Sequence, residues 1–297
     1  MRKLALIALA ALVVSLPLSG CLVKKKSPVT ISRSTDNMRI YQPEDYIVYD
    51  VQEQRSAADG TPLYANGTLR IDWIRTDDLP DPNAVGQLIP VLKEVTTLTF
   101  NGDSDTEIGT VRYISQDDDP NSPTYGEIRL HAIEAPGQAQ KYWLNSDGNL
   151  DTLTAPFTVF PSPLAMSGPQ SLTPFYLMQG CETNPATCEA VVGSFLDDNF
   201  EVVDDTSQIT TVMGIFTNLF RVNYSGISQP ISLPALPVLL DIRDACGGSQ
   251  PATTYHNGTM FVMPEIGVIH MLNMCQDDGM NPVIYNISLR DTNIPRP

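Results

Sequence analysis

Alternation of apolar and polar residues is the clearest pattern along the chain. In segment 68–75, Leu69, Ile71 and Trp73 fall on one side and polar residues on the other, as in a strand between a core and water. Comparable β-rich segments recur at 46–51, 95–100, 108–114, 126–133, 141–144, 191–203, 260–263, 267–274 and 283–289. Turn residues such as Asn66-Gly67 separate several of them. Short connections of this kind favour antiparallel neighbours.

The composition agrees with this pattern. The chain has 24 prolines and 19 glycines, which suits many turns between short strands. We therefore predict a mainly β fold: a large antiparallel, curved sheet, or an open barrel or sandwich, with few short helices. Segment 209–224 is ambiguous, because its apolar residues also fit a helical period.

The N-terminus has the pattern of an export signal. Met1-Arg2-Lys3 begins it, an apolar run extends to Leu18, and the small residues Ser19 and Gly20 precede Cys21. A positive start, a short apolar region and small residues at a cleavage site are typical of a secretory signal. The run is too short to span a bilayer comfortably, since that takes about 20 apolar residues.

The tetrapeptide Leu18-Ser19-Gly20-Cys21 resembles the bacterial lipobox. The resemblance implies that the leader is cut before Cys21 and that this cysteine carries acyl chains, which hold a protein stably on a membrane when there are two or more. Leu22, in place of Asp, implies sorting to the outer membrane. We thus expect a lipid-anchored protein of the cell envelope, facing the periplasm or the cell surface. Lys24 to Lys26 would then lie at the lipid headgroups.

The domain organisation follows from these segments. Residues 1–20 are the expected signal peptide, and residues 21–42 the lipidated cysteine with a flexible tether. About 20 extended residues reach roughly 65 Å, so this tether would let the domain stand clear of the membrane. Residues 43–297 are expected to form a single β-rich domain. A sub-boundary within the proline-rich stretch 155–175 is the alternative.

The other four cysteines are Cys181, Cys188, Cys246 and Cys275. An even number in an exported chain favours two disulfides. We favour Cys181–Cys188, which closes a short loop, together with Cys246–Cys275. A zinc site is the rival interpretation, but the chain lacks paired CxxC spacing.

Charge and motifs narrow the function classes. The net charge is −16, and loss of residues 1–20 removes Arg2, Lys3 and no acid, leaving −18. Such an acidic chain does not suit nucleic acid as a partner. We find no zinc-protease HExxH, no GxSxG, no P-loop and no GxGxxG. No catalytic residue, metal site or cofactor is predicted. The acidic clusters at 77–78, 117–119 and 277–278 fit solvated turns, with weak calcium sites as the alternative.

Trp73, Tyr142 and Trp143 are the candidate ligand-face aromatics. They would line a pocket for sugar or lipid on the concave side of the sheet. Packing in the core is the other interpretation of the same residues.

The layout of the chain resembles uncharacterised envelope lipoproteins built on one long antiparallel sheet. The resemblance rests on segments such as 46–51, 147–161 and 258–269. It implies a sheet that curls like that of the periplasmic lipoprotein carriers, and it transfers no functional residue. We expect a non-enzymatic binding or accessory domain, held at the membrane by Cys21, for an envelope lipid, glycan or protein. A carboxylate-dependent glycan hydrolase and a structural part of a surface assembly are the alternatives.

Overall fold

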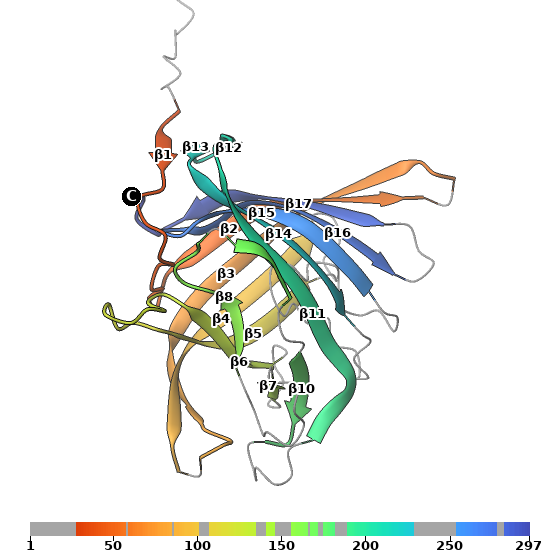
Figure 1. The fold of residues 1–297 in the computed structure, drawn as a ribbon. Coiled ribbons are helices and arrows are strands. Elements are labelled where there is room, and N and C mark those ends of the chain that lie inside the picture. The colour runs from red at the N-terminus through yellow and green to blue at the C-terminus, as the bar shows by residue number, and fades with distance from the viewer. Residues whose placement is uncertain are drawn as a thin grey trace, which may run out of the picture.

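The computed structural model describes residues 28–57, 59–84, 86–100, 107–134, 141–145, 156–165, 167–171, 175–181, 189–228, 254–277 and 282–297. All the regular secondary structure in these described residues is β strand (Figure 1). The predicted mainly β fold is confirmed, while the few short helices do not occur in the described part. No helix of that part is long and apolar enough to cross a membrane.

The strands, in chain order, are β1 (Thr30–Ser32), β2 (Tyr46–Ser56), β3 (Pro62–Pro80), β4 (Leu88–Phe100), β5 (Glu107–Gln116), β6 (Ile128–Glu134), β7 (Tyr142–Asn145), β8 (Phe157–Phe160), β9 (Ser167–Ser171), β10 (Phe175–Gln179), β11 (Glu189–Asp205), β12 (Ile209–Thr211), β13 (Gly214–Thr217), β14 (Leu219–Ser228), β15 (Thr254–Met263), β16 (Gly267–Asp277) and β17 (Val283–Thr292).

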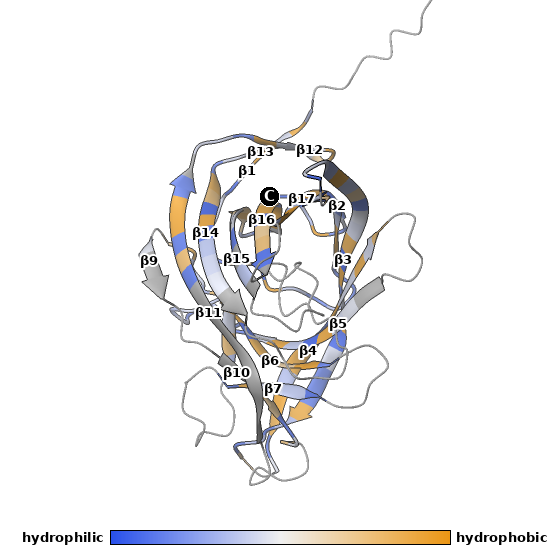
Figure 2. Ribbon diagram, turned by 90° about the vertical axis from the view of Figure 1, so that its right-hand side faces the viewer, coloured by the Kyte–Doolittle hydropathy of each residue, from blue (hydrophilic) through white to orange (hydrophobic). Residues whose placement is uncertain are grey.

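Fourteen strands form one large sheet. Its order is β10-β7-β6-β5-β4-β3-β2-β17-β16-β15-β14-β11-β9, with β8 paired to β6 beside this path. Neighbours along the chain are mostly neighbours in the sheet, as short connections favour. The early and late strands join where β2 pairs with β17. Strand β10 pairs with β7 and also with β11, so the sheet curves strongly (Figure 2).

The two faces of the sheet differ. The face that carries the larger apolar cluster, with Leu69, Trp73 and Ile287 among its members, is called the inner face. A smaller cluster lies on the opposite, outer face of β5, where Val111 and Tyr113 alternate with inward residues. The outer face of β2, β3 and β17 is more open, with polar residues alternating with the buried ones.

Segment 209–224 is built from strands. It contains β12, β13 and the start of β14, so the helical alternative is wrong. Phe216, Leu219 and Phe220 are buried in the inner cluster, which explains why the segment is so apolar. In the proline-rich stretch 155–175, β8 pairs with β6 and β9 pairs with β11 of the same large sheet.

The segment 28–42 differs from the expected flexible tether. Strand β1 pairs in parallel with β13, which it meets at Thr30↔Ile215. Met38 and Tyr41 are 1% and 7% exposed, so both belong to the core. The sequence of this segment conceals the packing, because its buried apolar residues, Ile31, Met38 and Tyr41, are set singly among polar neighbours. The predicted tether is therefore shorter than 21–42.

Candidate functional site

Trp73 lies on the inner face of β3, where it packs against Tyr41. The two rings are stacked, with centroids 4.0 Å apart and planes at 7°. Together with Glu94 and Arg112 they line a cavity of about 40 Å³. That volume suits about one or two water molecules. The cavity is too small for a lipid chain or a sugar.

Glu94 and Arg112 form a buried ion pair at this cavity. They face each other across β4 and β5, and the Arg112 Nε donates to Glu94 Oε1 at 2.6 Å. Thr96 donates its hydroxyl to the same oxygen at 3.2 Å. Charges that are taken out of water need such partners, since an isolated buried carboxylate is costly. The pair therefore belongs to the internal structure of the sheet.

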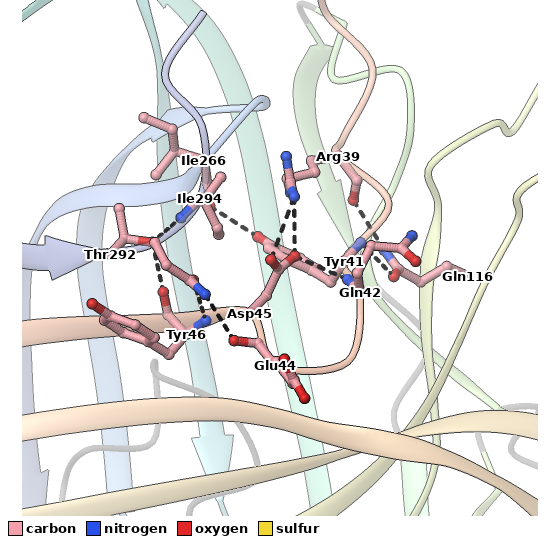
Figure 3. A network of polar contacts seen from close by, with 11 residues as sticks. Arg39, Tyr41, Gln42, Glu44, Asp45, Tyr46, Gln116, Ile266, Thr292 and Ile294 are labelled. Atoms are coloured by element: carbon pink, nitrogen blue, oxygen red, sulfur yellow. Dashed lines mark hydrogen bonds and ion pairs between the residues drawn. The ribbon is translucent and has the colours of Figure 1, made fainter.

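Tyr41 also bonds to two other parts of the chain, through Gln116 of β5 and Ile266 between β15 and β16 (Figure 3). Its hydroxyl donates to the carbonyl of Ile266 at 3.1 Å, and its backbone N–H donates to the Gln116 side chain at 2.9 Å. Burial, helped by the nearby Glu94 carboxylate, raises the pKa of Tyr41 well above its ordinary value. The hydroxyl thus stays neutral and serves as a donor. The network holds segment 39–46 in place.

A second inner carboxylate, Glu53, is also occupied. It accepts the hydroxyl of Tyr285 at 2.9 Å and a hydrogen bond from Arg55 Nη2 at 2.9 Å. Burial, with the Glu53 carboxylate as the next cause, raises the pKa of Tyr285 well above its ordinary value. Both inner carboxylates are therefore engaged with guanidinium groups.

The structure places the three candidate ligand-face aromatics in the core. Trp73 and Tyr142 are 3% and 4% exposed and belong to the inner cluster. Trp143 is 1% exposed and belongs to the smaller cluster on the outer face. The three rings therefore share no open surface, and core packing, the other interpretation, describes them.

The cysteines divide between the described residues and the rest of the chain. Cys181 and Cys275 are both buried. Cys188 and Cys246 lie outside the described residues, so the two favoured disulfides stay predictions. Cys21 lies outside them as well, and its acylation also stays a prediction.

The acidic cluster at 117–119 forms a hydrogen-bonded turn. The Asp117 carboxylate accepts the hydroxyls of Ser122 and Thr124, the latter at 2.6 Å. These bonds, with Ser122 as the larger cause, lower the pKa of Asp117. Among the described residues no group of three or more His, Cys, Asp or Glu side chains could hold a metal ion.

A groove lined by described residues lies on the outer face of β17, β2 and β3. Its volume is about 620 Å³, within the range of small-molecule sites. The strand register places its side chains in two rows across the three strands. The first row is Asn286, Gln52 and Asn66; the second is Ser288, Asp50 and Thr68. We call this region the outer groove.

The spacing of the outer groove follows from β geometry. Adjacent strands are about 4.8 Å apart, and side chains two residues apart on one face are about 6.8 Å apart. Three amides and two hydroxyls thus stand in a regular grid. Gln52, Asn66, Thr68, Asn286 and Ser288 make no side-chain hydrogen bond to the described residues. Their donors and acceptors are open to a ligand.

The groove also contains an ion pair and has an aromatic residue beside it. Arg290 Nη1 lies 3.3 Å from Asp50 Oδ1, and both side chains are about half exposed. Tyr64 precedes Asn66 by two residues on β3, so both point to the outer face. Tyr64 is 60% exposed, which makes its ring an open apolar surface beside the amides.

Sequence reasoning missed these groove residues. The alternation in β2, β3 and β17 marks them as outward, but an outward polar residue is usually only solvated. Their grouping depends on the pairing of β2 with β17, across more than 230 residues of chain. No short motif records that pairing.

One further polar pair joins β5 and β6. Ser115 Oγ and His131 Nε2 are 2.8 Å apart. Burial is the main cause that lowers the pKa of His131 to about 4, and Arg129 lowers it further. The nearby Asp81 opposes that shift. His131 is therefore neutral at physiological pH.

Three comparisons with known proteins bear on the identity of the chain. No family model, no curated protein and no solved structure matches it. Any function is therefore argued from the chain's own residues.

Proposed function

We propose that the protein is a lipid-anchored envelope protein whose β domain binds a glycan in the outer groove without catalysing a reaction. The observation that carries this proposal is the grid of open amides and hydroxyls beside the exposed ring of Tyr64. Sugars present many hydroxyls that both donate and accept, and their ring faces pack on aromatic side chains. Amide side chains match such hydroxyls because they also donate and accept.

The geometry favours a glycan over the other two ligand classes. A lipid would need an apolar cavity, and the inner cavity beside Trp73 holds only about 40 Å³. A protein partner would be expected to bury a patch with apolar residues at its centre, whereas the described lining of the outer groove is mostly amide, hydroxyl and charged groups.

Hydrolysis of the glycan has less support. A glycosidase uses two carboxyl groups that flank the scissile bond, about 5 to 9.5 Å apart. Among the described residues that line the outer groove, Asp50 is the one carboxylate. The inner Glu94 and Glu53 lie on the other face and are held by Arg112 and Arg55. The groove therefore suits holding a glycan better than cleaving it.

The binding arm of the proposal can be tested by titrating the purified domain with peptidoglycan fragments and with oligosaccharides released from lipopolysaccharide. We expect one of these to bind the wild type, and Tyr64→Ala or Asn286→Ala to weaken that binding at least about tenfold, the loss of one well-placed contact. Gln276→Ala removes an exposed amide from the neighbouring β16 and is the matched control. No binding by the wild type, or equal loss in the control, would contradict the proposal.

The anchor arm is tested separately by intact mass. Protein extracted from membranes should begin at Cys21 and carry the added mass of its acyl chains. Cys21→Ala should lack that mass. An unmodified wild-type chain would remove the membrane anchor from the proposal and leave the groove to the titration.

A further inference from the structure

The chain leaves the folded domain at one defined end. Val29 lies just before β1, and its carbonyl accepts the N–H of Ile215 in β13 at 2.9 Å. Strands β1, β12 and β13 form a small sheet of their own. Figures 1 and 2 show this sheet at one end of the molecule, where the described chain begins. We call it the anchor-side sheet.

Residues just after β1 are fastened to the large sheet. Arg33 Nη2 lies 2.8 Å from Asp204 Oδ1, and the Arg33 guanidinium lies 3.7 Å above the Phe220 ring. The backbone N–H groups of Ser34 and Thr35 donate to Glu265 Oε1 at 2.5 and 3.0 Å. Three separate parts of the chain thus hold this segment, and it cannot act as a loose spacer.

The fastened segment limits how far the domain can stand from its anchor. From Cys21 to Val29 the chain takes eight residue steps, which reach at most about 29 Å when fully extended. That is less than half of the roughly 65 Å expected for a tether of about 20 residues. A domain held this closely has the end that carries β1 as its nearest part to the membrane.

That end exposes apolar side chains. Val212, in the turn between β12 and β13, is 76% exposed and is the most exposed of the large apolar residues in the described chain. Val29 is 59% exposed. Arg296 stands beside them, because its guanidinium donates to the carbonyl of Met213 at 3.3 Å. Apolar tips next to a cation suit the boundary between lipid headgroups and acyl chains.

We propose that the anchor-side sheet docks on the lipid surface that holds Cys21, with Val212 and Val29 touching lipid and Arg296 at the phosphates. This inference rests on the acylation of Cys21 in the proposed function. The acyl chains supply the affinity, and the docking surface sets the orientation of the domain. The outer groove on β17, β2 and β3 would then keep a fixed direction relative to the membrane.

The test uses acylated, full-length protein in phosphatidylethanolamine–phosphatidylglycerol vesicles whose acyl chains carry bromine. Val212→Trp places a fluorophore at the proposed contact. Leu88→Trp is the matched control, because Leu88 is 59% exposed and pairs with Pro80 where β3 ends and β4 begins. Figure 1 shows the turn of the β3–β4 hairpin away from β12 and β13. The native Trp73 and Trp143 are buried, so the wild type supplies the background.

We expect the emission of Val212→Trp to shift to the blue and to be quenched several times more strongly than that of Leu88→Trp. Equal quenching of both variants in protein of confirmed acyl mass would overturn the docking surface and leave the proposed function intact. A chain without acyl mass would instead overturn the anchor, and the docking proposal with it. A thermal melt of each variant checks that the fold is kept.

Discussion

Two carboxylate–guanidinium pairs, one on each face of the sheet, show how differently the faces are used. Glu94 and Arg112 lie inside, are 1% and 9% exposed, and approach to 2.5 Å. Asp50 and Arg290 lie outside, are 54% and 53% exposed, and stand 3.3 Å apart. The inner pair is shielded from bulk solvent, while the outer pair is exposed to it. The inner face thus serves the fold, and the outer face is open to a ligand.

The largest effect should come from breaking the inner pair. Arg112→Met leaves the Glu94 carboxylate buried without its guanidinium, which should lower the free energy of unfolding by about 3–5 kcal/mol. Urea unfolding of the variant and the wild type measures this. Adding Glu94→Leu to Arg112→Met removes the orphaned charge and should recover much of the loss. A loss below about 1 kcal/mol for Arg112→Met, as for a surface pair, would contradict the contrast between the faces.

A smaller effect on the free energy of unfolding, one that depends on pH, should come from His131 on β6. In the folded protein the pKa of His131 is lowered to about 4, whereas an unfolded histidine titrates near 6.5. Below about pH 6.5 the unfolded chain binds a proton that the folded chain refuses, so stability is lost as the pH falls toward 4. The two pKa values limit this loss to about 3 kcal/mol.

The contribution of His131 is isolated with His131→Gln. The difference in unfolding free energy between wild type and variant should shrink from about pH 7 to about pH 4.5, because the glutamine does not titrate. Comparing urea unfolding at both pH values cancels the common titration of the many carboxylates. A difference that stays constant with pH would show that His131 is not held neutral by its surroundings.

The smallest effect on stability should come from the outer pair. Asp50→Asn should change the unfolding free energy by less than about 1 kcal/mol, since exposed pairs contribute little. The same variant should still weaken glycan binding, because it alters the centre of the outer groove. A thermal melt and the oligosaccharide titration measure the two effects. A large loss of stability would mean that the fold depends on the outer pair as much as on the inner one.

The sequence predicts the β architecture well, but it does not predict the outer groove. Alternation in 68–75 places Leu69, Ile71 and Trp73 on one buried face, which the structure confirms. Alternation separates two faces but does not tell which of them is covered: Trp143, a candidate ligand-face aromatic, is a buried member of the outer cluster. The outer groove depends on strand register between Gln52 and Asn286, which no local pattern encodes.

The packing of 28–42 escapes prediction for a different reason. Its contacts are single long-range ones, such as Tyr41 on Trp73 and Arg33 on Asp204, set among polar neighbours. A hydrophobic pattern is recognised over several consecutive residues, so an isolated buried residue among polar neighbours does not produce one. Regular elements are therefore easier to predict than a covering segment held by a few side chains.

Strand β1 also decides where mechanical force enters the domain. In the proposed anchored state, a pull from the membrane arrives along the chain that precedes Val29. The first bonds to carry that load are the short parallel ladder of β1 with β13 and the grip of Arg33 on Asp204 and Phe220. They carry this load before it reaches the long ladders of the fourteen-stranded sheet. Segment 28–42 thus stands between the anchor and the sheet, and a pull on the anchor would have to break its few contacts before it strained the strands behind it.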